Sequence, residues 1–221
     1  MTMNISVYRI LPVGTGEEAE ISLEISNGKE TQTIKGTVSA AMFAELRLPL
    51  SLSSPLSVTK DRCEQILRCM KLHAAIKKGI YLLGYARNTA KSLKHKLKAK
   101  GYPEDIAEEA TAYLKQKGYI REKDEALLLA ENLAKHKSYG KNRIRKEMFV
   151  KGFPEEVIRE TLELIEIDFS EICAERIRSM GGAEIFASPE TKNRAVASLL
   201  RYGFSYHDIR EATDILRAEN E

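Results

Sequence analysis

Histidine and cysteine are the residue types in this chain of 221 residues that could act as acid–base catalysts, nucleophiles or zinc ligands. They occur at His73, His95, His136 and His207, and at Cys63, Cys69 and Cys173. They form no CxxC or HExxH motif, and Cys63 and Cys69 would lie about 240° apart around a helix. The sequence also has no Walker, GxSxG or GxGxxG loop. We therefore expect exposed histidines, no catalytic site, no metal and no cofactor, so the protein is predicted not to be an enzyme.

Basic side chains are the stronger functional signal, because they are concentrated in two stretches. Residues 59–118 carry a net charge of +8, although the whole chain has only +3. Lys91–Lys100 contains five lysines and no acid, and Lys135–Lys151 contains seven basic residues against Glu147 alone. Such clusters favour a polyanionic partner, either nucleic acid or an acidic protein surface. The alternative is that they are solvated helix faces.

The first 58 residues have the pattern of a small sheet. Ile21, Leu23 and Ile25 alternate with polar residues, and Asn27-Gly28 is a hairpin signal. A short helix is expected over 40–48, followed by a loop rich in serine and proline. We predict a separate β-containing lobe that the rest of the chain does not need in order to fold.

Three glycines then mark an internal repeat. Gly101, Gly152 and Gly203 are 51 residues apart, and each is followed by an aromatic residue. A left-handed residue that ends a helix is most easily a glycine, so each is predicted to close a helix. Twelve residues earlier stand the predicted caps, Thr89, Gly140 and Thr191. The aromatic residues Tyr102, Phe153 and Phe204 are predicted to pack as core corners.

The repeat predicts the fold class. Three prolines, at 103, 154 and 189, fit the starts of helices. We expect a mainly α protein of three tandem three-helix repeats, resembling helix-turn-helix units and stacked in an elongated, curved array. The predicted limits are 1–58 for the β-containing region, 59–118 for the first repeat with a long leading helix, 119–166 for the second repeat and 167–221 for the third.

The second helix of each repeat carries the predicted partner-binding residues. Lys91, Lys94 and Lys98 share one face of this helix in the first repeat, while Leu93 and Leu97 face the core. The full set is Lys91, Lys94 and Lys98 in the first repeat, Lys141, Arg143, Arg145 and Lys146 in the second, and Arg194 and Arg201 in the third. A basic ridge repeated along an array is suited to a charged filament or a phosphate backbone.

The order and spacing of these features resemble the RecX family, regulatory proteins that modulate the RecA recombinase. The resemblance covers residues 70–217. It rests on Tyr81-Leu82-Leu83, Leu93, Leu97, Lys100-Gly101-Tyr102, Gly118-Tyr119-Ile120, the run Arg143–Met148, Lys151-Gly152-Phe153 and Arg201–Ser205. The chain departs from the family pattern at 121–125: where the family favours two acids it has Arg121 and Glu122, and Glu125 replaces a phenylalanine.

The resemblance implies a protein that binds in the groove of a RecA–DNA filament and limits its activity, without a cofactor. Direct, weak and salt-sensitive DNA binding is left open. The alternatives are a helix-turn-helix transcriptional regulator and an RNA-binding accessory module. We further expect a cytoplasmic monomer that does not enter a membrane, because the chain shows no signal peptide, no run of 18 apolar residues and no cysteine pairing pattern.

Overall fold

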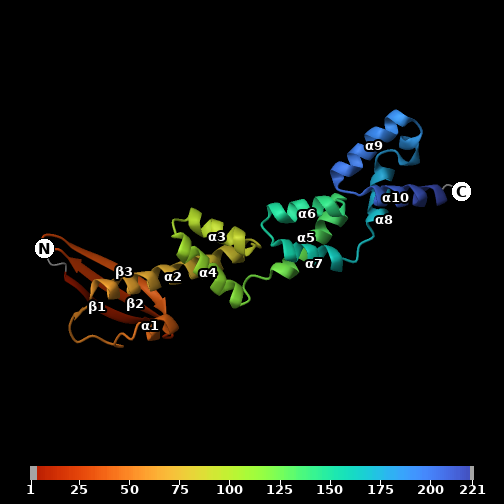
Figure 1. Cartoon of the computed structure of the whole chain (residues 1–221). Coiled ribbons are helices and arrows are strands. Elements are labelled where there is room, and N and C mark those ends of the chain that lie inside the picture. Colours follow the sequence, from red (N-terminus) through yellow and green to blue (C-terminus); the bar gives the residue numbers. More distant parts are fainter. Residues whose placement is uncertain (1–3, 220–221) are drawn as a thin grey trace. The chain divides into compact units, whose positions relative to one another are not determined.

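The computed structural model of the chain describes residues 4–219, which are mainly helical with a small sheet at the start (Figure 1). This confirms the predicted fold class. The described residues form two compact units: the first holds 4–88 with 93–120, and the second holds 89–92 with 121–219. One division therefore falls near the predicted limit at residue 118. The repeat limits and the elongated, curved arrangement stay predictions.

The sheet of the first unit is antiparallel and has the strand order β3-β2-β1-β4. Its strands are β1 (Asn4–Val13), β2 (Glu18–Ser26), β3 (Thr31–Ser39) and β4 (Leu56–Ser57). Alternation along β1 and β2 turns Val7, Ile21 and Leu23 into the core. The side chain of Asn27 accepts backbone N–H bonds from Lys29 and Glu30, which makes the predicted hairpin turn between β2 and β3.

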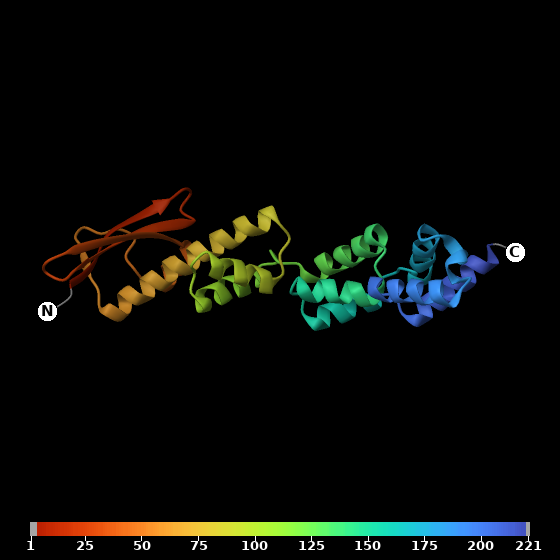
Figure 2. The same cartoon turned by 90° about the horizontal axis from the view of Figure 1, so that it is seen from above.

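Two helices cover the sheet, α1 (Ala40–Glu45) and α2 (Lys60–Tyr85). The first half of α2 lies along the sheet, and its Cys63, Ile66 and Met70 are part of the same buried core (Figure 2). Met70 packs so closely on β3 that a Cβ on Gly36 would collide with it. The sheet is therefore not a lobe with a core of its own, in contrast to the expectation from sequence, because one long helix serves both the sheet and the first repeat.

The second half of α2 forms the first three-helix repeat with α3 (Ala90–Ala99) and α4 (Glu104–Gln116). Leu93 and Leu97 of α3 and Leu114 of α4 are fully buried. A Cβ on Gly79 would collide with Leu114, so a glycine lets α4 approach α2 closely.

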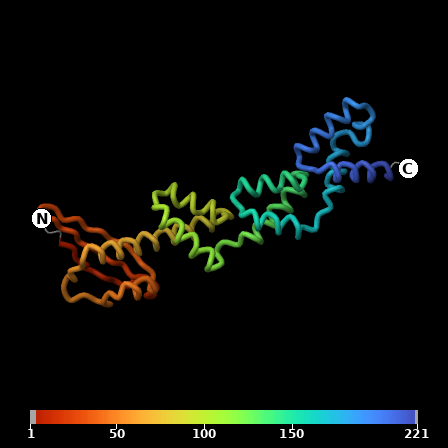
Figure 3. Tube along the Cα trace, in the orientation of Figure 1, coloured from red at the N-terminus to blue at the C-terminus, as the bar shows by residue number. Residues whose placement is uncertain are grey.

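The second unit contains the other two repeats, whose backbone can be followed in Figure 3. Each of them has its own buried core. The second repeat is α5 (Glu122–Lys137), α6 (Lys141–Val150) and α7 (Glu155–Leu164). The third is α8 (Phe169–Ser179), the short 3-10 helix η1 (Gly182–Phe186), α9 (Pro189–Tyr202) and α10 (Tyr206–Ala218).

The three repeat glycines end α3, α6 and α9 as predicted. Gly101, Gly152 and Gly203 have φ values of +88°, +87° and +94°. After each glycine, the aromatic residue donates its backbone N–H to a carbonyl in the last turn of the helix: Tyr102 to Leu97, Phe153 to Met148 and Phe204 to Leu199. This is the Schellman pattern. Phe153 and Phe204 are buried and Tyr102 is half-buried, in line with their predicted place in the core.

The starts of the helices differ from the prediction at two points. Helix α9 begins at Pro189 and is capped by Ser188, which accepts from the backbone N–H of Thr191. Thr191 is therefore the third residue of the helix and closes a capping box, not the cap itself. Pro103 and Pro154 lie one residue before α4 and α7, whereas Pro189 is the first residue of its helix.

Within the second unit, two glycine corners each receive the start of a helix from an earlier repeat. At the first corner, the Thr89 hydroxyl donates to the Lys151 carbonyl at 3.1 Å. At the second, the backbone N–H groups of Gly140 and Asn142 donate to the carbonyls of Tyr202 and Gly203 at 2.9 and 3.0 Å. The second corner therefore ends one helix and accepts backbone donors at the start of another, which need such acceptors, whereas the first corner holds Thr89, the residue before α3, by its hydroxyl.

Candidate partner-binding surface

The nine basic residues predicted to bind a partner lie on the helices α3, α6 and α9. Each of these helices buries only one stripe of side chains, so its other sides can carry charged residues. The buried pairs are Leu93 and Leu97, Ile144 and Met148, and Ala195 and Leu199. These pairs repeat every 51 residues and fix which side of each helix faces the core. The remaining sides carry the basic residues, but the structure gives them different partners.

In the first repeat, two of the three predicted lysines are paired with acids of α4. The ammonium of Lys94 lies 3.0 Å from Glu108 and 3.3 Å from Glu104, and that of Lys98 lies 3.0 Å from Glu104. The hydrogen bond to Glu108 raises the pKa of Lys94, and the hydrogen bond from Lys98 lowers the pKa of Glu104. These lysines therefore join α3 to α4, and each faces a carboxylate.

The same brace recurs in the second repeat. Arg145 and Glu155 stand 51 residues after Lys94 and Glu104, and their charged groups are 3.5 Å apart. In the third repeat the equivalent positions are Val196 and Tyr206, so the brace is replaced by an apolar and an aromatic side chain. The pairing of second-helix cations with acids that start the third helix is thus a property of the first two repeats.

Arg143 belongs to the junction between repeats rather than to an open basic surface. Its guanidinium lies 4.6 Å from the centre of the Tyr139 ring, 3.4 Å from Glu147, and donates to the Arg201 carbonyl at 3.3 Å. A cation held over an aromatic face and fixed by hydrogen bonds is positioned to support packing. In the third repeat, Arg194 pairs with Glu190 at 2.7 Å within one turn of α9.

Three of the exposed cations among the nine predicted residues lie on α6. Lys141 and Lys146 are exposed, and no ion pair holds either of them among residues 4–219. Arg145 is exposed despite its pairing with Glu155. Positions 141 and 145, and their neighbours 142 and 146, lie one turn apart and so face the same side of the helix. Arg201 is exposed on α9.

Two exposed apolar residues extend this side of α6, and the charge pattern of the sequence does not reveal them. Phe149 is 62% exposed and Val150 is 81% exposed. The ammonium of Lys91 lies 5.9 Å from the centre of the Phe149 ring. We name the set Lys141, Arg145, Lys146, Phe149 and Val150 the α6 outer face. In the sequence, the α6 outer face could have been recognised from its Phe-Val pair, which stands where the first repeat has Lys98-Ala99.

Glu122 is a buried carboxylate whose role the sequence did not indicate. Its Oε1 accepts the backbone N–H of Ala90, the first residue of α3, at 2.9 Å. A negative charge at a helix start satisfies a free donor and interacts favourably with the helix dipole. Glu122 lies in the segment where the chain departs from the family pattern, and it fixes the start of the helix that carries Lys91.

The histidines and cysteines are dispersed, but one expectation about them was wrong. His73 is buried, with Nε2 3.2 Å from a carboxylate oxygen of Glu18, because α2 lies against the sheet there. Burial raises the pKa of the Cys173 thiol to about 12. Residues 4–219 contain no group of histidine, cysteine and acidic residues arranged to hold a metal ion. Over the same residues, none of the helices is both long and apolar enough to span a bilayer.

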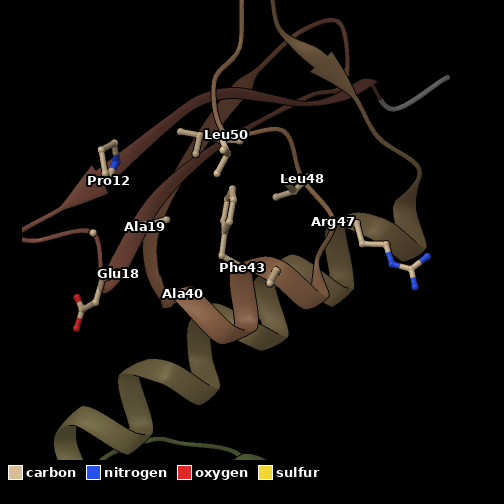
Figure 4. A pocket seen from close by; sticks show the side chains of 11 residues that line it. Pro12, Glu18, Ala19, Ala40, Phe43, Arg47, Leu48 and Leu50 are labelled. Atoms are coloured by element: carbon tan, nitrogen blue, oxygen red, sulfur yellow. The ribbon is translucent and has the colours of Figure 1, made fainter.

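A cavity of about 420 Å³ lies in the first unit between the sheet and α1. Figure 4 shows the ring of Phe43 pointing towards Leu50, with Glu18 and Arg47 on opposite sides of the cavity. The carboxylate of Glu18 is held by Lys77 at 2.9 Å. The cavity therefore offers mainly apolar surface, and none of the nine predicted residues lines it.

The known proteins with similar sequences all carry the name RecX in the comparisons that follow. A family model described as "RecX, first three-helix domain" matches residues 75–114. The chain is 25% identical over 186 residues to the regulatory protein RecX of Caldanaerobacter subterraneus subsp. tengcongensis, a match that covers 82% of this chain and 90% of that protein. It is also 25% identical to the regulatory protein RecX of Bacillus velezensis over 66% of this chain and 57% of that protein.

Solved structures show that the fold is shared as well. A crystal structure of a regulatory protein RecX matches with a TM-score of 0.73, covering 95% of this chain and 99% of the other at 16% identity. RecX from Lactobacillus salivarius matches with a TM-score of 0.60 over 67% of this chain and 97% of the other, at 22% identity.

Proposed function

We propose that this chain, which belongs to the RecX family of regulatory proteins, binds filaments of the RecA recombinase and limits their activity in homologous recombination and DNA repair. The observation that carries the proposal is the sequence similarity to a regulatory protein RecX, which covers 82% of this chain and 90% of that protein. The similar proteins are named regulatory proteins, which supports a regulatory role. RecA as the target rests on the resemblance to the RecX family described in the sequence analysis. The proposal includes no catalytic step and no cofactor.

The basic surface that supports this proposal is narrower than the nine residues predicted. Lys141 and Lys146 on α6 are exposed and carry no ion pair within residues 4–219, whereas Lys94 and Lys98 are held by acids of α4. A filament of protein on DNA presents phosphates and acidic side chains, and exposed lysines can approach both without first breaking an existing pair.

The packing of α6 speaks against the alternative of a helix-turn-helix transcriptional regulator. Helix-turn-helix proteins read base edges with the first residues of the recognition helix. Here Gly140 and Asn142, at the start of α6, donate to the Tyr202 and Gly203 carbonyls. The first residues of α6 are therefore covered by a corner of the third repeat, and α7, the helix that follows the turn of the second repeat, begins with the acids Glu155 and Glu156, which DNA phosphates repel.

The proposal is tested by measuring binding to RecA filaments and to bare single-stranded DNA, with RecA ATPase activity as a second readout. The test variant is K141A/K146A and the matched control is K94A/K98A, which removes two lysines that are already paired. We expect the test variant to bind filaments about 2- to 30-fold more weakly, because each exposed charge contact contributes about 0.2–1 kcal/mol. The loss should shrink at high salt, since screening weakens these contacts in the parent.

The same measurements on the unsubstituted protein test the proposed function directly. If it neither binds RecA filaments nor changes their ATPase activity at moderate salt, the proposed function is wrong. A sequence-specific shift of duplex DNA by the parent would instead favour the transcriptional regulator.

A further inference from the structure

Phe149 and Val150 form an apolar pair on the surface of the second unit. They are consecutive residues at the end of α6, 62% and 81% exposed. The core side of this part of α6 is taken by Met148, which is fully buried. Two large apolar side chains in sequence are thus left in solvent on a helix whose other exposed residues are polar or charged.

The repeats supply an internal control that shows this exposure is not required by the fold. The residues equivalent to Phe149 and Val150 are Lys98-Ala99 in the first repeat and Leu200-Arg201 in the third. Lys98 is exposed and pairs with Glu104, and Leu200 is half-buried against the core of its own repeat. The same backbone position therefore accepts a lysine, and packing within the second repeat does not call for an exposed phenylalanine there.

The surroundings of the pair are basic. The Lys91 ammonium is 5.9 Å from the centre of the Phe149 ring, close enough for a cation–π interaction. Arg145 lies one turn before Phe149, and Lys146 lies one turn before Val150. The pair thus forms an apolar centre with cations around it. This is the composition of a protein-interaction hot spot, in which an aromatic anchor is surrounded by polar residues that exclude water.

We infer that the α6 outer face docks on a protein surface that has an apolar pocket with carboxylates at its rim, supplied by the protein part of the filament. The inference rests on the proposed function and names the residues that anchor it. Phe149 and Val150 enter the pocket, while Lys141, Arg145 and Lys146 face the carboxylates.

The composition of the pair favours protein over DNA as the occupant. A phenylalanine ring can stack on a base, but Val150 has no aromatic face and is the more exposed of the two. Phosphates can pair with lysines but gain nothing from contact with a valine side chain. A pocket in a protein can bury both side chains, and a buried phenylalanine alone removes about 150–250 Å² from water.

The experiment exchanges the pair for its own counterpart in the first repeat, as F149K/V150A. Glu155 stands where Glu104 stands in the first repeat, so the new lysine can make the pair that Lys98 makes, and the variant is expected to fold. A second variant, F149A/V150A, removes the apolar pair without adding a charge. The control is L164A, which removes another exposed apolar side chain from the same unit. Binding of each protein to RecA filaments and to bare single-stranded DNA is measured, together with thermal unfolding.

We expect both double variants to bind RecA filaments at least about 30-fold more weakly than the parent, as for loss of a hot spot. Binding to bare DNA and the melting temperature should stay unchanged for F149A/V150A, and L164A should behave as the parent. Filament binding that survives in both double variants overturns the inference while the proposed function stands. An equal loss of filament and DNA binding overturns it in favour of base stacking. A parent that does not bind filaments removes the proposed function and the inference together.

Discussion

The glycine corners at Gly203 and Gly101 share one backbone conformation but have different surroundings. Their φ values are +94° and +88°, and the same hydrogen bonds end the helix before each of them. A Cβ on Gly203 would collide with the backbone of Arg143, because the start of α6 docks there. A Cβ on Gly101 would meet nothing within 4 Å. One sequence motif therefore has two roles: every copy ends a helix, and only some copies also join repeats.

Gly152 is intermediate between these two corners. A Cβ there would lie 3.1 Å from the Thr89 hydroxyl and 3.3 Å from the side chain of Lys91. Its neighbours are side chains, which can move, whereas the neighbour of Gly203 is backbone. The comparison therefore predicts a graded response when each glycine is replaced by alanine.

The largest effect is expected for G203A. The substitution combines left-handed strain of about 1–2 kcal/mol with an overpacking cost of about 1–3 kcal/mol at the Arg143 backbone. We expect the free energy of unfolding to fall by about 3 kcal/mol or more, measured by urea denaturation with circular dichroism. If G203A lowers the free energy of unfolding no more than G101A does, the contact of Gly203 with Arg143 adds no packing cost and the two corners do not differ.

A smaller loss, about 2 kcal/mol, is expected for G152A. Left-handed strain is the same, but the Thr89 and Lys91 side chains can shift by a few tenths of an ångström. The double variant T89A/G152A tests whether the Thr89 side chain is the cause of the loss. Removing the Thr89 hydroxyl makes room for the new Cβ but also deletes its bond to Lys151, so the two losses should not be additive.

For G101A we expect only about 1 kcal/mol, since strain is the single cost. The control is G84A, where a Cβ also meets nothing within 4 Å but the backbone is that of an ordinary helix. G84A should be neutral or stabilising, because alanine has the higher helix propensity. If G101A and G84A have equal stabilities, the left-handed corner carries no strain.

The joint between the sheet and α2 contrasts with the glycine corners, because it includes a charge pair and should depend on pH. Both Glu18 carboxylate oxygens lie 2.9 Å from the Lys77 ammonium, and this hydrogen bond, with His73 nearby, lowers the pKa of Glu18. A lowered pKa in the folded state means that the stabilisation is complete above the ordinary value of 4.5 and is lost as the pH falls through the folded pKa.

We therefore expect K77M to destabilise the protein by less than about 1 kcal/mol at pH 7, as is usual for partly exposed pairs. The difference from the parent should vanish as the pH drops well below 4.5. The matched control is K60M, which removes one member of the exposed Lys60–Glu64 pair and should change little at either pH. A difference between K77M and parent that grows on acidification would contradict this account. Urea denaturation at several pH values provides the measurement.

Much of the fold could be predicted because it depends on local features of the sequence. The spacing of Gly101, Gly152 and Gly203 placed three helix ends, since only glycine adopts a left-handed conformation at little cost. The pattern Ile21-Leu23-Ile25 and the Asn27-Gly28 turn placed the hairpin. The start of α9 was missed, because Ser188 and Thr191 are both good capping residues and local pattern does not choose between them.

The candidate site was predictable only in part. Composition identified α6 as basic, but it did not reveal that Lys94 and Lys98 are held by acids of α4 or that Arg143 supports the junction at Arg201. Helical periodicity says which residues share a face, not which neighbouring helix covers that face. Phe149 and Val150 were overlooked because an apolar residue beside a buried methionine looks like core until the packing is known.

The sequence by itself determined the repeat and the ends of its helices, because helix capping and left-handed glycines act over a few residues, and the same repeat carries the resemblance to the RecX family. Only the tertiary structure decided which partner each charged side chain has, that Glu122 caps α3, and that α2 shares its core with the sheet. The physical reason is distance along the chain. Contacts such as Ala90 with Glu122 and Gly140 with Tyr202 join residues 32 and 62 positions apart, and they form only once the helices have packed.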